Sequence, residues 1–162
     1  MAKSNFLERM HAVHSHPSTV VAACEDMMDT TTASDVISMK NAQTAVFLII
    51  QCANAGGASK VTVNACSDTT PTTTEACSFS YRMITAADTH GDVTGATTTG
   101  FTTSTGANIV YYIEVDRQDL ISSGYEYVQL ATSETTNAAV DGAITCFLTN
   151  LRYADLTATQ VS

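Results

Sequence analysis

Short apolar stretches separated by polar segments recur along the chain from residue 36 onward. The stretches are rich in β-branched and aromatic residues, and the segments between them consist mostly of turn-forming Gly, Thr, Asn, Asp and Ser. This spacing is typical of an antiparallel sandwich or barrel. We expect an all-β fold, a jelly-roll-like antiparallel β-sandwich of about seven or eight strands. The predicted strands are residues 36–39, 44–53, 60–66, 76–85, 109–116, 125–132 and 142–153.

The stretch 44–53 is apolar on both of its faces. Because successive strand residues point to opposite sides, Leu48 and Ile50 share one face, and Phe47 and Ile49 share the other. A strand that is apolar on both sides is typical of one covered by protein on both sides. We therefore expect this strand to be central and buried on both faces.

The composition excludes several classes of protein. Among 162 residues, 16 are acidic and 7 are Lys or Arg, which gives a net charge of −9. The chain lacks the excess of basic residues that nucleic-acid binding requires, so we expect no nucleic-acid partner. Its longest apolar run, residues 45–50, is far shorter than the roughly 20 residues of a membrane-spanning helix, so no membrane partner is expected.

The cysteines indicate a reducing compartment. They are odd in number and form no CxxC motif, so they do not imply a disulfide framework. Charged Glu8 and Arg9 stand where a signal peptide would carry its apolar segment, which favours assembly in a cytoplasm. The cysteines are Cys24, Cys52, Cys66, Cys77 and Cys146.

Residues 1–35 differ in pattern from the rest of the chain. Phe6, Met10 and Val13 recur at helical spacing with Leu7 beside them, and the proline at position 17 would end such a helix. These four apolar side chains lie outside the alternating body and are predicted to contact a partner. The expected organisation is an N-terminal arm with a short helix (1–35), a β-sandwich domain (36–154) and a C-terminal tail (155–162).

Histidines offer the most plausible metal ligands. His11, His14 and His16, with Cys24 nearby, could supply four zinc ligands, but their spacing matches no standard zinc finger. His90 lies in a DTHGD segment that lacks the bidentate Glu of an EF-hand loop, and a plain turn is the simpler interpretation. We expect no bound metal, with the arm histidines solvated or in contact with another subunit.

Catalytic patterns are absent from the sequence. It contains no GxSxG elbow, phosphate-binding loop or dinucleotide fingerprint. Glu114, Asp116 and Asp119 could be read as glycosidase carboxylates, but the polar end of a strand entering a turn explains them more simply. Cys52, Cys77 and Cys146 fall on apolar strand faces and are expected to be core residues. We therefore expect no enzyme activity and no cofactor.

Several stretches, taken in order, resemble a group of small structural proteins of tailed bacteriophages, the capsid decoration or cement proteins. The elements of the resemblance are ISMKN before an apolar strand, IEVD before a short acidic turn, and RYA at the end of the last strand. The quoted stretches are VISMKNAQTAVFLIIQCANAGGASKVTVNAC, FSYRM, NIVYYIEVDRQDL, YEYVQLATS and ITCFLTNLRYA, within residues 36–154.

The resemblance implies a virion structural protein without catalytic residues. Such a protein would bind the major capsid protein on the outer surface of the shell and stabilise the shell. The family also implies a homo-oligomer, for which a trimer would match the local threefold axes of a shell. A strongly acidic chain is repelled by packaged DNA, which favours the outer surface.

The segment 86–108 supports an alternative function. It is longer than most loops, so we expect an exposed excursion or a weak hairpin around Phe101. In the alternative, the chain is a phage tail or fibre module whose loop binds a host receptor or glycan through exposed aromatic side chains. Phe101 is the residue of this segment that fits such a role.

Overall fold

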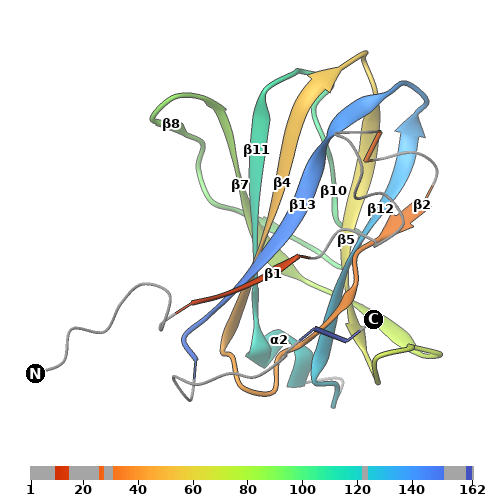
Figure 1. The fold of residues 1–162 in the computed structure, drawn as a ribbon, viewed down its shortest axis with the longest axis vertical. Helices are drawn as coiled ribbons and strands as arrows, with labels where there is room; N and C mark the ends of the chain where they lie inside the picture. Colours follow the sequence, from red (N-terminus) through yellow and green to blue (C-terminus); the bar gives the residue numbers. More distant parts are fainter. Residues whose placement is uncertain (1–9, 15–25, 28–30, 122–123, 152–159, 162) are drawn as a thin grey trace, which may run out of the picture.

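Two antiparallel sheets of seven strands each make up the fold (Figure 1). The computed structural model describes residues 10–14, 26–27, 31–121, 124–151 and 160–161. Sheet 1 has the order β1 (His11–His14), β13 (Val140–Thr149), β4 (Thr44–Asn54), β11 (Ile109–Asp116), β7 (Phe79–Ala86) and β8 (Thr89–His90), and β9 (Thr94–Ala96) also pairs with β7. Sheet 2 has the order β10 (Phe101–Thr102), β5 (Ala58–Cys66), β12 (Tyr127–Thr136), β3 (Val36–Ser38) and β14 (Gln160–Val161), with β2 (Thr31–Ala33) on β12 and β6 (Thr74–Cys77) on β5.

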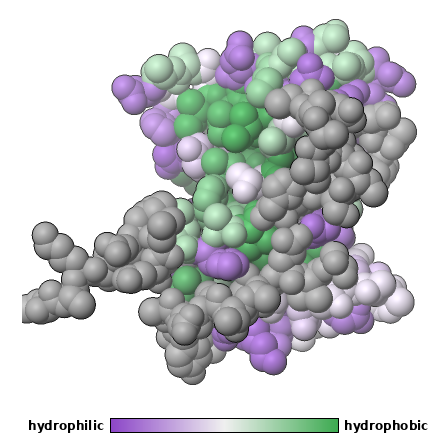
Figure 2. Space-filling view, in the orientation of Figure 1, coloured by the Kyte–Doolittle hydropathy of each residue, from purple (hydrophilic) through white to green (hydrophobic). Residues whose placement is uncertain are grey.

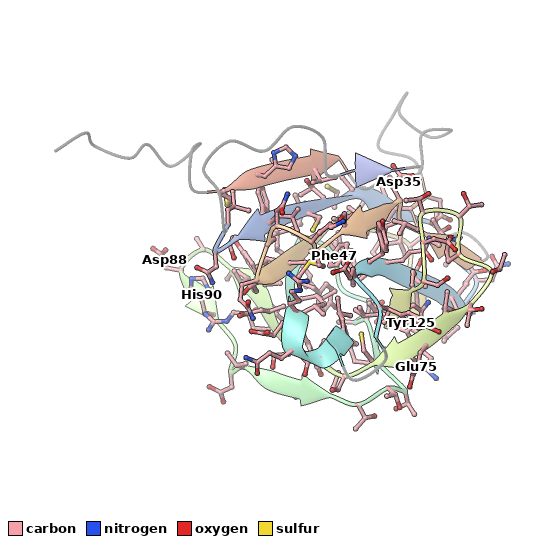
Figure 3. All side chains as sticks on the ribbon, turned by 90° about the horizontal axis from the view of Figure 1, so that it is seen from below. Asp35, Phe47, Glu75, Asp88, His90 and Tyr125 are labelled. Atoms are coloured by element: carbon pink, nitrogen blue, oxygen red, sulfur yellow. The ribbon has the colours of Figure 1, made fainter. Side chains whose placement is uncertain are left out.

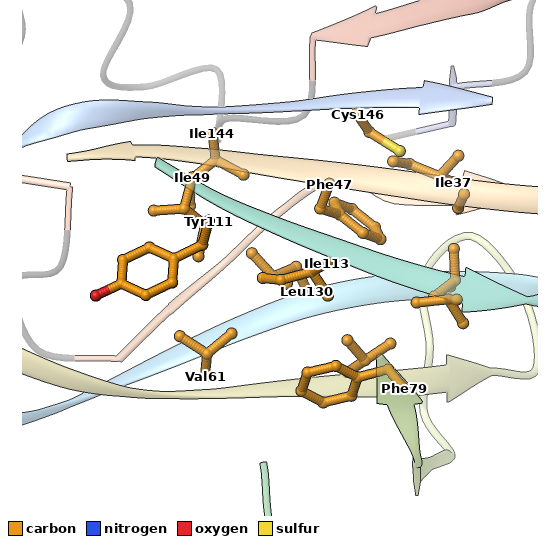
Figure 4. Close-up of a cluster of buried hydrophobic side chains, with 14 of the residues drawn as sticks. Ile37, Phe47, Ile49, Val61, Phe79, Tyr111, Ile113, Leu130, Ile144 and Cys146 are labelled. Carbon is orange, nitrogen blue, oxygen red and sulfur yellow. The ribbon is translucent and has the colours of Figure 1, made fainter. Parts of the chain in front are cut away.

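The core lies between the two sheets, as Figure 4 shows. Inward-facing residues of β4, β11 and β13 meet those of β5 and β12, and most of them are fully buried. Burying one such Leu, Ile or Phe side chain contributes about 1.5–3 kcal/mol. The central inward residues are Phe47, Ile49, Val61, Val63, Tyr111, Ile113, Val128, Leu130, Ile144 and Cys146.

These sheets confirm the predicted all-β sandwich. The predicted strand 109–116 coincides with β11, and the prediction 44–53 falls within β4. The predicted strand 76–85 is interrupted at Ser78, where the chain leaves sheet 2 after β6 and enters sheet 1 as β7. The structure has more strands than expected because short segments add to the edges of both sheets.

The expectation that residues 44–53 are buried on both faces is wrong. β4 is central in sheet 1, and Phe47 and Ile49 are fully buried in the core. The opposite face is only half-buried at Leu48, and Ile50 is 36% exposed. A two-layer sandwich covers one face of each sheet, so the described chain provides no second layer over β4.

The predicted N-terminal helix is not confirmed. His11–His14 form the strand β1, which pairs antiparallel with β13, while residues 1–9 lie outside the described residues. Asp26 bridges to Asp141, Met27 is buried, and β2 joins sheet 2. Described parts of the segments 1–35 and 155–162 therefore pair with the sandwich as β1, β2 and β14, and the boundaries at residues 36 and 154 stay a prediction.

Gly142 allows Met27 to pack against sheet 1. The register between β13 and β4 shifts between Val140 and Gly142, which is a β-bulge. A Cβ at Gly142 would clash with the backbone oxygen of Ile50 and lie 2.6 Å from the sulfur of Met27. Only glycine leaves room for this packing.

One short helix, α2 (Arg117–Ile121), follows β11 at one end of the sandwich. The Asp116 carboxylate accepts a hydrogen bond from the backbone N–H of Gln118 at 2.8 Å, which caps the first turn. Leu120 anchors the helix because it is fully buried. No helix in the described ranges is long and apolar enough to cross a lipid bilayer.

Candidate functional site

The four predicted partner-binding residues fall in different environments. Val13 is 3% exposed and lies opposite Cys146 in the core, which corrects the expectation that its side chain is left for a partner. Met10 is half-buried at the start of β1. Phe6 and Leu7 lie outside the described residues, so their contact with a partner stays a prediction.

The predicted metal ligands are only partly described. His11 is half-buried in β1, His90 is exposed in β8, and the side chains of His14, His16 and Cys24 lie outside the described part. Figure 3 places His90 at the margin of the molecule, beside Asp88. Among the described residues, no group of three or more His, Cys, Asp or Glu side chains is arranged to hold a metal ion.

The buried thiols are poor nucleophiles. Burial raises the pKa of Cys66 to about 11, with a smaller contribution from the charge of Asp68. Burial, followed by the charge of Asp119, raises the pKa of Cys77 to about 11. Burial also raises the pKa of Cys146. At neutral pH these thiols are protonated and behave as small apolar side chains.

Arg117, which directly follows the IEVD motif, links the two sheets at one end of the sandwich. The Arg117 guanidinium donates to the backbone oxygen of Lys40 at 2.9 Å and to the Glu126 carboxylate at 3.1 Å. Gln43 donates to Asp116 at 2.8 Å. Lys40 lies in the ISMKN segment and Asp116 ends IEVD, so these motifs fix connections between β3, β4, β11 and β12.

Phe101 is part of the sandwich rather than an exposed loop residue. It pairs with Val61 on β5, and its ring stacks on Tyr81 with a centroid distance of 4.0 Å and an interplanar angle of 4°. Phe79 and Tyr111 contact the same ring. The segment 86–108 is mostly exposed, as expected, but its short strands β8, β9 and β10 pair with both sheets, and Phe101 packs within the sandwich instead of standing at the tip of a hairpin.

A further surface is the outer face of sheet 1, of which the sequence analysis placed only the β4 residues in the interior. Its side chains point away from the core in three cross-strand rows on β7, β11, β4 and β13. The rows are Ser80, Glu114, Val46 and Phe147; then Arg82, Tyr112, Leu48 and Thr145; then Ile84, Val110, Ile50 and Ala143. Figure 2 shows a hydrophobic area over the upper parts of β11 and β4.

A groove of about 300 Å³ opens at one side of this outer face. The β8–β9 connection forms one wall, where Val93 is 59% exposed. Arg82 and Glu114 line the groove together, and the two do not form an ion pair with each other. The lining residues are Val46, Ser80, Tyr81, Arg82, His90, Val93, Tyr112 and Glu114.

Apolar side chains on an open sheet face mark a surface that contacts another protein or a ligand. The only signal for this face in the sequence is the unbroken apolar run AVFLII, in which the outward residues are as apolar as the inward ones.

No protein-family model matches the chain, and no similar curated protein or solved structure was found.

Proposed function

We propose that this chain is a virion structural protein, a decoration or cement protein that binds the outer surface of a phage capsid and stabilises the shell. The observation that carries the proposal is the apolar outer face of sheet 1. Val46, Leu48, Ile50 and Val110 present aliphatic groups on the two central strands of the sheet. Such a surface suits contact with another protein better than the turnover of a soluble substrate.

The hydrogen bonds of Arg117 support the same role. The motifs on which the resemblance rests supply backbone and side-chain contacts that fix the ends of the strands, and Asp116 caps α2. They therefore serve the architecture of the sandwich.

The charge of the chain favours the outside of the shell. At −9, it is repelled by the phosphates of packaged DNA. Part of the basic charge stands near the N-terminus, where Lys3 and Arg9 flank Phe6 and Leu7. In this proposal, residues 1–9 contact the major capsid protein, and β1 ties them to sheet 1 through its pairing with β13.

Binding to shells tests the proposal. The full chain is added to capsids assembled from the major capsid protein of the same phage without this chain. We expect saturable co-sedimentation and a higher melting temperature of the shells. Absence of binding to such capsids would contradict the proposal.

A short deletion tests the contribution of residues 1–9. The deletion stops before β1, because Val13 and Met27 belong to the core and a longer deletion would damage the sandwich. We expect the shortened chain to keep its own melting temperature and to lose most of its capsid occupancy. Full occupancy would show that these residues do not bind the shell.

A further inference from the structure

The outer face of sheet 1 differs in charge from the molecule as a whole. The chain carries −9, yet the three rows on β7, β11, β4 and β13 contain one basic residue, Arg82, and one acidic residue, Glu114. Two copies of an acidic protein repel each other over most of their surfaces. They approach with least repulsion where each face is close to neutral.

We infer that this face is a self-association surface, on which two copies of the chain pack about a two-fold axis with Arg82 of each copy opposite Glu114 of the other. The inference deepens the proposed function by naming the partner of that face, and it rests on that proposal in treating the face as a contact between proteins. A face that packs on the same face of a second copy forms an isologous interface, so the expected unit is a dimer in place of the trimer that the resemblance implies.

The register supports this arrangement. Arg82 lies opposite Tyr112, and Glu114 is two residues further along the same strand, so the two charged residues are diagonal neighbours, with Cα atoms about 7 Å apart. Consider a two-fold axis that lies in the plane of the face, passes midway between Arg82 and Glu114, and is perpendicular to the line that joins them. Rotation about this axis brings Arg82 of one copy over Glu114 of the other. The rotated copy then places a carboxylate over each guanidinium, and two intermolecular pairs form.

The same rotation brings apolar groups together. With ordinary strand and residue spacings, it places Leu48 near its own counterpart in the second copy. It also places Phe147 and Val46 over Ile84 and Val110. The strands of the two copies cross at about 70°, which is near the orthogonal class of sheet packing.

The area of the face sets the expected strength of the self-association. Four strands and three rows cover about 19 Å by 20 Å, or about 400 Å² on each copy. The total of about 800 Å² lies below the range for stable protein complexes, about 1,200–2,000 Å². We therefore expect a weak, reversible dimer whose population rises with protein concentration.

The experiment is sedimentation velocity on the full chain from about 1 µM to about 1 mM, the concentrations at which weak to moderate interfaces form. We expect a monomer–dimer equilibrium for the unaltered chain. Arg82→Glu alone and Glu114→Arg alone are each expected to shift association to at least tenfold higher concentration, because each places like charges opposite each other.

An equimolar mixture of the two variants is expected to restore dimers, because unlike charges then meet at both contacts. The double variant Arg82→Glu/Glu114→Arg is expected to associate by itself for the same reason. Lys60→Glu on the outer face of sheet 2 and Glu75→Arg on β6 make the same changes in charge away from the face, and they should dimerise like the unaltered chain. Thermal unfolding confirms that each variant is folded.

Three results would overturn the inference. They are a monomer throughout the concentration range, a trimer as the associated species, and a mixture of the two variants that stays monomeric. Capsid binding is measured separately. A monomer that still decorates shells would refute the dimer and leave the proposed function standing, whereas a dimer that never binds shells would do the reverse.

Discussion

The two sheets of the sandwich contribute equally to the core but differ on their outer faces. On sheet 2, the central strands β5 and β12 point Lys60, Thr62, Asn64, Gln129 and Ser133 outward. On sheet 1, the corresponding positions of β4 and β11 carry Val46, Leu48, Ile50, Val110 and Tyr112. The same architecture therefore presents a polar surface on one side and an apolar surface on the other.

Hydrogen bonds follow the same division. Gln129 donates to the backbone oxygen of Ser34 at 2.7 Å, and Thr62 donates to that of Ala131 at 3.5 Å, so polar side chains on sheet 2 are bonded to neighbouring strands. Aliphatic groups on sheet 1 have no such bonds to make. They lower their free energy only by leaving water. The difference is the basis for proposing the outer face of sheet 1, rather than that of sheet 2, as the contact face.

The largest effect that tests this comparison lies on adjacent residues of β4. Phe47 is fully buried and faces the core, and its replacement in Phe47→Ala should lower the free energy of unfolding by about 3–5 kcal/mol. Leu48 faces outward, and Leu48→Ala should cost less than about 1 kcal/mol, as at other surface positions. Urea unfolding at low protein concentration, where the chain is monomeric, measures both values.

Equal costs for the two substitutions would contradict the assignment of the faces. They would mean that another part of the chain covers Leu48 as completely as sheet 2 covers Phe47.

Sequence periodicity predicted the strands well where one face is apolar and the other polar. In the second half of β11, Ile113 and Val115 alternate with Glu114 and Asp116, and the prediction matches the observed strand at both ends. In β4 the two faces are equally apolar. The pattern shows that both faces avoid water, but it does not show whether the chain itself or another molecule covers them.

The short strands at the edges of the sheets were harder to predict, because pairing with a neighbouring strand, rather than the local residue pattern, determines whether they form. β1 has the sequence HAVH, in which Val13 alone is a large apolar residue, and its conformation depends on the exposed edge of β13. Phe101 stands among Gly and Thr residues that predict a loop, yet its ring stacks on the ring of Tyr81. Such contacts between distant segments leave no periodic signal.

A second, smaller effect tests whether the stability of the sandwich and self-association through its outer face are independent. Arg117→Ala removes the bonds to Lys40 and Glu126, and because the Arg117 side chain is only 11% exposed, we expect a loss of about 1.5–3 kcal/mol. Glu126→Gln keeps an acceptor at a position that is 45% exposed and should cost less than about 1 kcal/mol. Both variants should self-associate like the unaltered chain at temperatures where they are folded. Urea unfolding and sedimentation velocity measure the two properties.

Buried thiols predict a pH dependence of stability, to which Cys66 and Cys77 of sheet 2 contribute together with Cys146 of sheet 1. The pKa values of Cys66 and Cys77 are about 11, above the value of about 8.5 for a free thiol. As the pH rises above about 8.5, the thiols of the unfolded chain lose their protons while the buried thiols of the folded chain keep theirs. The free energy of unfolding therefore falls until about pH 11. Below about pH 8 the contribution is complete and constant. Unfolding curves from pH 8 to pH 11 should fall more steeply for the unaltered chain than for a Cys66→Ala/Cys77→Ala variant, and equal slopes would show that these thiols ionise normally.

The smallest effect compares thiols on the two sheets by alkylation. Cys52 is half-buried and follows Ile50 on the outer face of sheet 1, whereas Cys66 and Cys77 are buried in sheet 2. In a Cys24→Ser background at pH 8, iodoacetamide should label Cys52 before Cys66 and Cys77, whose raised pKa values keep them protonated. If two copies cover the outer face of sheet 1, the labelling of Cys52 should slow at high protein concentration, while labelling of the sheet 2 thiols stays the same. Mass spectrometry of digests taken over time measures each rate. The slowing should disappear in Arg82→Glu, which has the same thiols but associates poorly; if it persists there, protection of Cys52 comes from something other than the Arg82–Glu114 contact.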